Sequence, residues 1–565
     1  MPFSIPDRST SDVSLSRTSW LLIVACYAVV TVWVTWPQAV SWRDVPMHQD
    51  PYFSIWRLTW IAHQLPRDPL HLFDTNIFFP TRGTLAFSDA VLFQGLVASP
   101  LLWLGIPSVI VYNTLILGSF IVSGVAMFIL ARALTHSTLA AFVAGLIFSQ
   151  LPYRIDHFVH MEILWGFWMP LAVWAFLRTV DTHRTKYGIL TGAFVAAQAL
   201  SGIYYAIFLV TILVVLTVLL AAFGAWRDLL KGAKAFAIGG VIAIVIVLPY
   251  MRPYVEGSRA VGTRSVEEMT HYSATLTNYL STGGENWLYG SKLAPLGDHE
   301  KRLFPGFIAL ALALVGLWPL DRRKLLFALA LAFAVDLSCG YNGFTFPIVS
   351  TLIPPYQGLR VTARAAILAF LFLSVLAAYG VARLQALPWL RTPRAAAGVA
   401  VLIAALVVVE YTNMDLAMQK LPRKTPALAR FLAQDSARVI MHYPVPRPEA
   451  LPGLDPWYSY LSTFHWKKLI NGYSAFVPPG YIGFMEVMRR FPDDRSLDEI
   501  RHRKIDLLVI HRSGMPASHF SELMIALENR PDLTFAGAFA DGNLGALVYR
   551  VRRDQAPNQD PDQKR

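Results

Sequence analysis

Membrane-length apolar segments follow one another from residue 19 to residue 412 of this 565-residue chain. A helix needs about 20 apolar residues to cross the hydrocarbon core of a bilayer. The windows that approach this length are residues 19–37, 108–132, 138–152, 163–178, 187–201, 204–224, 235–251, 304–319, 325–341, 361–384 and 395–412. Only 15% of the residues are charged, whereas soluble domains have about 25%. The chain is therefore predicted to be a polytopic α-helical membrane protein with about 11 transmembrane helices.

The basic residues predict which side of the membrane each loop occupies. With residues 1–18 in the cytoplasm, alternation puts every short basic connection on the cytoplasmic side, as the positive-inside rule requires. These connections contain Arg132; Arg178, Arg184 and Lys186; Arg227, Lys231 and Lys234; Arg322, Arg323 and Lys324; and Arg383, Arg391 and Arg394. The same topology explains the formal net charge of +12, so no nucleic-acid partner is expected. Residues 38–107, 153–162 and 252–303 then lie outside, together with the chain after residue 412.

The composition changes after residue 412, where proline, charged residues and turn residues become more frequent. Strands are predicted at residues 438–443, 505–511, 533–540 and 544–551, and helices near 427–434, 481–490 and 517–528. This pattern predicts an extracytoplasmic α/β domain over residues 413–552, after a membrane domain over residues 19–412. The tail, residues 553–565, is rich in Asp, Gln and Pro and is predicted to be disordered.

Asp50 is the strongest candidate for a catalytic residue. It lies in the first external loop, shortly after the first apolar segment, and just before one of two predicted interfacial helices, residues 51–65 and 88–104. A carboxylate at a membrane surface is costly unless it is solvated or has a function. The alternative is that Asp50 caps the helix that begins at Pro51, and Asp89 has the same two interpretations at the second helix.

A short external turn between two spans contains five ionisable side chains: Arg154, Asp156, His157, His160 and Glu162. If the turn is helical, Asp156 and His160 share a face. Three interpretations remain open, namely metal ligands, contacts to a polar substrate headgroup, and a solvated loop. The spacing matches no specific metal signature.

Arg360 and Arg364 do not follow the charge rule, because they lie at the outer mouth of a span. They are four residues apart and therefore lie on one helical face, an arrangement suited to binding a phosphate. Snorkelling to the interface is the alternative. The external loop 252–303, which contains Tyr272, is long enough to be either a substrate-covering lid or a static cap.

Together these features resemble the GT-C superfamily of polyprenyl-phosphate-sugar-dependent glycosyltransferases, and more closely its YfhO-like bacterial members. The similar stretches are residues 76–80, 151–154, 272–274, 358–364 and 471–474. The resemblance implies that the acid of the first external loop, here Asp50, is the catalytic base or an acceptor-binding group. No Asp-x-Asp pair surrounds Asp50, so the resemblance neither requires nor excludes a divalent cation, Mg²⁺ or Mn²⁺.

The leading hypothesis is an inverting glycosyltransferase of the cytoplasmic (inner) membrane that acts on the extracytoplasmic face. Its expected partners are a polyprenyl-phosphate-linked sugar donor, a lipid, glycan or protein acceptor, and membrane lipids. Asp50 is the expected base, and the substrate-binding candidates are Asp89, Arg154, Asp156, His157, His160, Glu162, Tyr272, Arg360 and Arg364. Two alternatives stay open: a lipid or oligosaccharide transporter, and a catalytically silent cell-envelope assembly protein.

Overall fold

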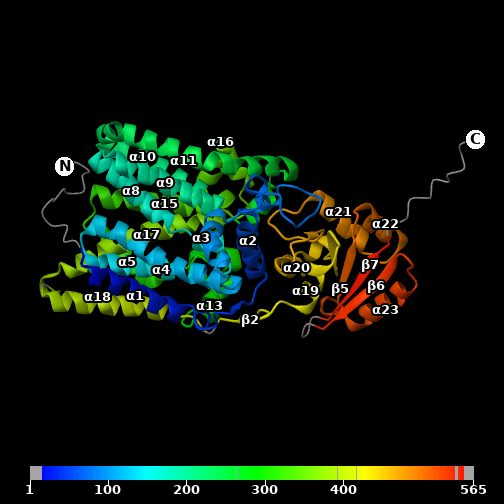
Figure 1. Ribbon diagram of the computed structural model, residues 1–565. Helices are drawn as coiled ribbons and strands as arrows, with labels where there is room; N and C mark the ends of the chain where they lie inside the picture. The colour runs from blue at the N-terminus through cyan, green and yellow to red at the C-terminus, as the bar shows by residue number, and fades with distance from the viewer. Residues whose placement is uncertain (1–14, 263, 391, 415, 541–544, 553–565) are drawn as a thin grey trace, which may run out of the picture. The chain divides into compact units, whose positions relative to one another are not determined.

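The protein is described by a computed structural model that covers residues 15–262, 264–390, 392–414, 416–540 and 545–552. Most of the expected cytoplasmic N-terminus, residues 1–18, and the tail 553–565 lie outside these described residues. The chain forms two compact units (Figure 1). Unit 1 consists of Met1–His48, Asp89–Ser258 and Gly262–Lys420, and unit 2 of Gln49–Ser88, Arg259–Val261 and Leu421–Arg565.

Unit 1 is a helical bundle, and each apolar window of the sequence contains a helix. The helices are α1 (Arg17–Val34), α4 (Ser108–Thr135), α5 (Thr138–Gln150), α8 (Trp168–Thr182), α9 (Thr185–Ser201), α10 (Ile203–Leu220), α11 (Trp226–Val261), α14 (Phe307–Leu317), α15 (Arg322–Ser338), α17 (Ala366–Gln385) and α18 (Pro393–Glu410). Seven described helical segments are long and apolar enough to cross a membrane, and one of them, Ile203–Arg259, joins α10 to α11. The polytopic helical fold is thereby confirmed.

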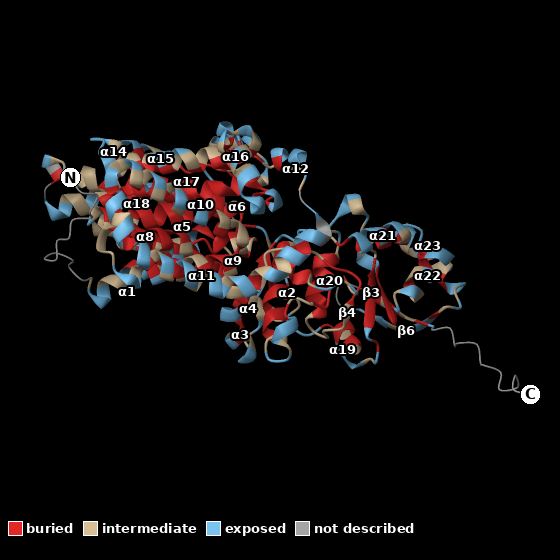
Figure 2. Ribbon diagram, turned by 90° about the horizontal axis from the view of Figure 1, so that it is seen from above, coloured by how far each residue is buried: buried red, intermediate tan, exposed pale blue. Residues whose placement is uncertain are grey.

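Helix α17 occupies the centre of the bundle. Most of its residues are buried, and Figure 2 shows buried residues on the helices around it as well. It packs against α5, α14 and α15. The approach to α14 is close because both helices present glycine: a Cβ at Gly380 would lie 2.0 Å from the Leu312 carbonyl oxygen, and one at Gly316 would lie 2.1 Å from that of Leu376. Small residues allow membrane helices to approach in this way.

The connections of unit 1 that are predicted to be extracytoplasmic contain short elements. They are α3 (Leu92–Trp103), α6 (Pro152–Asp156), α7 (Met161–Leu164), α12 (Val266–His271), α13 (Gly290–Leu293) and α16 (Thr345–Leu352), with 3-10 turns that include His299–Lys301 and Thr362–Ala365. Strand β1 (Asp44–Pro46) pairs antiparallel with β2 (Met418–Lys420). This pairing joins the segment after the first apolar helix to the segment after the last one.

Unit 2 contains a five-stranded mixed sheet in the order β4-β3-β5-β7-β6. The strands are β3 (Val439–Tyr443), β4 (Lys468–Leu469), β5 (Leu507–His511), β6 (Leu533–Phe539) and β7 (Ala546–Val551). Strands β3, β4 and β5 are parallel, and β7 is antiparallel to both β5 and β6. The helices are α19 (Ala427–Gln434), α20 (Asp455–Ser462), α21 (Pro479–Met488), α22 (Asp494–His502) and α23 (Ala517–Glu528). All predicted strands and helices are present, and β4, α20 and α22 are additional.

Part of the loop that follows α1, Gln49–Ser88, also belongs to unit 2. Helix α2 (Asp50–Gln64) packs against α20, and most of its side chains are buried. The backbone N–H of Phe79 donates to the Leu469 carbonyl at 2.8 Å, so this loop segment adds to β4. The sequence predicted α2 as an interfacial helix of the membrane domain, whereas the structure places its apolar side chains against the α/β fold.

Candidate functional site

Asp50 is the first residue of α2, and the residue is 9% exposed. Its position one residue inside the helix differs from the capping position, which Gln49 occupies without a side-chain hydrogen bond. The Tyr473 hydroxyl donates to Oδ1 of Asp50 at 2.8 Å. A negative charge in the first turn is also stabilised by the helix dipole. Both sequence-based interpretations of Asp50, a catalytic base and a residue that stabilises the start of α2, therefore stay predictions.

Asp89 caps a different helix from the one expected. Its Oδ1 accepts a 2.6 Å hydrogen bond from the backbone N–H of Ile203, the first residue of α10. Helices α9 and α10 share one connecting residue, Gly202, so the amide at the start of α10 needs a partner from elsewhere in the chain. This contact gives Asp89 a structural role in the described fold.

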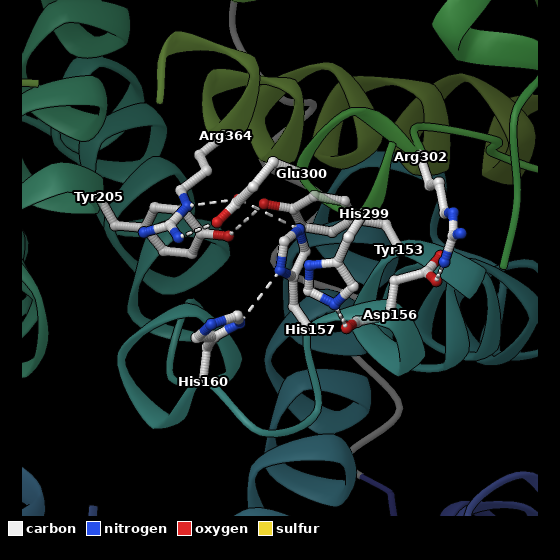
Figure 3. A network of polar contacts seen from close by, with 9 residues as sticks. All are labelled: Tyr153, Asp156, His157, His160, Tyr205, His299, Glu300, Arg302 and Arg364. Atoms are coloured by element: carbon white, nitrogen blue, oxygen red, sulfur yellow. Dashed lines mark hydrogen bonds and ion pairs between the residues drawn. The ribbon is translucent and has the colours of Figure 1, made fainter. Parts of the chain in front are cut away.

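A cluster of charged and histidine side chains gathers three outer segments of unit 1 (Figure 3). We define the outer cluster as Asp156, His157, His160, His299, Glu300, Arg302 and Arg364. The guanidinium of Arg364 binds Glu300 with two hydrogen bonds, Nη2 to Oε1 at 2.7 Å and Nε to Oε2 at 3.1 Å. Burial alone raises the pKa of Glu300, but the charge of Arg364 outweighs burial and holds that pKa well below 4.5. The pair is therefore ionised.

The histidines of the outer cluster lie within reach of one another. Nδ1 of His157 is 3.2 Å from Nδ1 of His160, and the His299 ring is 5.2 Å from His157 and 5.8 Å from His160, centroid to centroid. Burial lowers the pKa of His157 well below its ordinary value and also lowers that of His299. Both rings are consequently neutral at neutral pH.

Asp156 joins the external loop 252–303 to the bundle. Its carboxylate accepts from Arg302 Nη1 at 3.3 Å, and its backbone carbonyl is 2.6 Å from Nε2 of His299. With the Arg364–Glu300 pair, these contacts attach the end of the loop at three points. The loop is closed onto the bundle in this structure.

Two further predicted substrate-binding residues have other surroundings. Arg154 is completely buried, its Nη2 donates to the Leu164 carbonyl at 2.9 Å, and its guanidinium lies 4.8 Å from the Phe120 ring centroid. It thus ties α6 to α7 and α4 inside the bundle. Glu162, in α7, lies next to Gly202 in the α9–α10 connection.

Arg360 lies beside a group of tyrosines at the outer mouth of α17. Its guanidinium is 5.1 Å from the Tyr272 ring centroid, and its backbone N–H donates to the Tyr204 hydroxyl at 2.7 Å. Burial lowers the pKa of Arg264, and the nearby charge of Arg360 lowers it further. Arg364 also lies near Tyr204, 5.5 Å from its ring centroid, but its guanidinium is bound to Glu300.

The described residues contain no group of three or more His, Cys, Asp or Glu side chains that could hold a metal ion.

Sequence reasoning overlooked His299, Glu300, Arg302 and the hydroxyl of Tyr473. The run Asp298-His299-Glu300-Lys301-Arg302, five ionisable residues in front of an apolar segment, was the available signal for the first three. Tyr473 lies in the stretch 471–474 that the resemblance marks, but its contact with Asp50 was not predictable because the two residues are more than 400 positions apart.

Comparison of the sequence with protein-family models and with curated proteins finds no match. Solved structures do resemble the fold. Arabinofuranosyltransferase AftD from Mycobacteria aligns with a TM-score of 0.65 and 13% identity over 96% of this chain and 40% of AftD. ArnT from Cupriavidus metallidurans bound to undecaprenyl phosphate aligns with a TM-score of 0.52 and 14% identity over 96% of this chain and 100% of ArnT. The chain is a multi-pass membrane protein with a GT-C-like fold, and spans about 40% of the length of AftD.

Proposed function

We propose that the protein is an inverting membrane glycosyltransferase that moves a sugar from a polyprenyl-phosphate donor to an acceptor on the extracytoplasmic face of the cytoplasmic membrane. The observation that carries this proposal is the Asp50 carboxylate, nearly buried at the start of α2 and held by Tyr473. A carboxylate withdrawn from water is suited to general-base catalysis. The likeness to ArnT, solved with undecaprenyl phosphate, supports the class of donor.

In the proposed reaction the acceptor hydroxyl gives its proton to Asp50 while its oxygen bonds to the anomeric carbon of the sugar. The bond from that carbon to the phosphate oxygen breaks, and its electron pair leaves with the polyprenyl phosphate. Attack on the face opposite the leaving group inverts the anomeric centre. Arg360 would stabilise the charge that develops on the phosphate, because a guanidinium can bind it through two hydrogen bonds. Arg364 could join it only after exchanging Glu300 for the phosphate.

The experiment measures sugar transfer by the purified full-length protein from radiolabelled polyprenyl-phosphate sugars. Arabinofuranose is the first sugar to test, because AftD is an arabinofuranosyltransferase. Asp50→Asn should lower the transfer rate by about 10²–10⁴-fold, the usual contribution of a general base. Asp68→Asn is the matched control, because Asp68 is an exposed acid of the same loop that pairs with His71. A wild-type transfer rate in Asp50→Asn would show that Asp50 is not the catalytic base.

A further inference from the structure

The C-terminal α/β domain contributes a side chain to the carboxylate that the proposed function uses as its base. Tyr473 follows β4, and its hydroxyl donates to Oδ1 of Asp50 at 2.8 Å. The Tyr473 ring also packs edge-on against Phe53, with centroids 5.0 Å apart, one turn along the helix that carries Asp50. Both contacts lie within unit 2.

The backbone that carries Tyr473 is fixed from the side of the sheet. Asn471, two residues earlier, is fully buried. Its Oδ1 accepts from the His442 N–H at 2.7 Å, and its Nδ2 donates to the His442 carbonyl at 3.1 Å and to Asp455 at 3.0 Å. These bonds clamp the segment after β4 to the end of β3. Fully satisfied buried polar groups specify one backbone position.

The same backbone is fixed from the side of the first external loop. The Phe78 N–H donates to the Asn471 carbonyl at 3.1 Å, and a Cβ at Gly472 would come within 2.7 Å of the Phe78 ring. Asn76 then connects this loop to α2, because its Oδ1 accepts from the Trp56 indole at 3.1 Å. The contacts form a closed ring from α2 through the loop and Tyr473 back to Asp50.

We propose that Tyr473 is a positioning residue that holds the Asp50 carboxylate for proton abstraction, which makes the C-terminal domain a part of the catalytic apparatus. This inference rests on the proposed function. The hydroxyl donates to one oxygen of the carboxylate and so fixes the rotation of the group, which reduces the reorganisation needed during the reaction. Tyr473 does not need to contact the donor or the acceptor in this role.

The test is steady-state kinetics of full-length Tyr473→Phe with the labelled donor. We expect kcat to fall about tenfold while the donor KM stays within twofold, because a group that acts only on the base leaves donor binding unchanged. When Tyr473→Phe is added to Asp50→Glu, kcat should fall less than twofold further, because the effects of substitutions at coupled residues are not additive. Tyr549→Phe, which removes a hydroxyl on β7 that lies near the Met524 sulfur, is the control and should retain wild-type kcat.

Two outcomes separate failure of the inference from failure of the proposed function. If Asp50→Asn transfers sugar like wild type, the proposed base is wrong and Tyr473 has nothing to position. If Asp50→Asn is inactive but Tyr473→Phe keeps wild-type kcat, or if its loss is fully additive with Asp50→Glu, only the inference is overturned. Should Tyr473→Phe unfold, Tyr473→Gln, which keeps a hydrogen-bond donor, is compared with Tyr473→Ala, which leaves the Asp50 carboxylate unpositioned. A kcat of Tyr473→Ala equal to that of wild type would also overturn the inference.

Discussion

Both carboxylate oxygens of Glu300 are bound by Arg364, which reaches them with Nη2 at 2.7 Å and Nε at 3.1 Å. The two side chains are only 14% and 10% exposed. Glu300 lies in the external loop and Arg364 at the start of the central helix region, so this pair fastens the loop to the core of the bundle. Removing one partner from a buried pair leaves the other charge without compensation.

Glu300→Gln should therefore loosen the loop and lower stability by about 3 kcal/mol. The measurement is the thermal unfolding temperature in detergent, together with the rate of proteolysis within residues 262–303. Asp298→Asn is the control, because the Asp298–Lys301 pair is more exposed and contributes little. Equal behaviour of the two variants would contradict the role given to the Arg364–Glu300 pair.

The buried histidine pair of the α/β domain predicts sensitivity to acid. His442 Nδ1 and His511 Nε2 are 2.7 Å apart, and burial lowers the pKa of His511 to about 4. Below pH 6.5 the His511 side chain binds a proton in the unfolded chain but stays neutral in the folded protein. The free energy of unfolding therefore falls as the pH drops from 6.5 toward 4. The loss attributable to His511 at pH 5 is about 2 kcal/mol.

His511→Gln should flatten this dependence, whatever its effect on stability at pH 8. The unfolding temperature of wild type and variant is measured from pH 8 to pH 5, and it should fall less in the variant than in wild type. Parallel curves would show that His511 does not take up a proton on unfolding.

Arg360→Ala should raise the donor KM about 10–100-fold, the value of a charge-assisted hydrogen bond to phosphate. Arg360→Lys should recover only part of this loss, because lysine cannot bind two oxygens in the planar arrangement of a guanidinium. Arg394→Ala, at an exposed site on the predicted cytoplasmic side, should leave the donor KM unchanged. A normal donor KM together with a normal kcat in Arg360→Ala would remove Arg360 from the phosphate site.

Gly380→Val tests the packing of α14 on α17. The new side chain would collide with the Leu312 carbonyl, since even a Cβ would lie 2.0 Å from that oxygen. Overpacking of this kind costs about 1–3 kcal/mol, visible as a lower unfolding temperature. Gly398→Val on α18 meets nothing within 4 Å and is the control. If both variants unfold at the same temperature, the two helices are less closely packed than described.

The sequence predicted the helices well because length and hydropathy are local properties. Each apolar window contains a helix, and the four strands β3, β5, β6 and β7 were also found. Strand β4 was missed because it has two residues. The association of residues 49–88 with the α/β domain was missed for a different reason. It depends on pairing between Phe79 and Leu469, which no local pattern records.

The candidate site was predictable in its residues more than in its contacts. Asp50, His157 and Arg364 were selected from the sequence because ionisable residues next to a membrane are unusual, and their functional roles stay predictions. Their partners Tyr473 and Glu300 come from distant segments, and the pairing of Arg364 with Glu300 spans 64 positions. Complete burial of Arg154 was equally invisible, because its neighbours are backbone carbonyls and the Phe120 ring.

We propose that the protein transfers sugar from a polyprenyl phosphate with Asp50 as the base. The most direct measurement follows both products in proteoliposomes that contain the purified wild-type protein, a labelled polyprenyl-phosphate sugar and an acceptor. We expect one polyprenyl phosphate to be released for each sugar transferred, and neither product to be formed by Asp50→Asn. Movement of the intact donor across the bilayer without release of polyprenyl phosphate would contradict it and indicate a transporter.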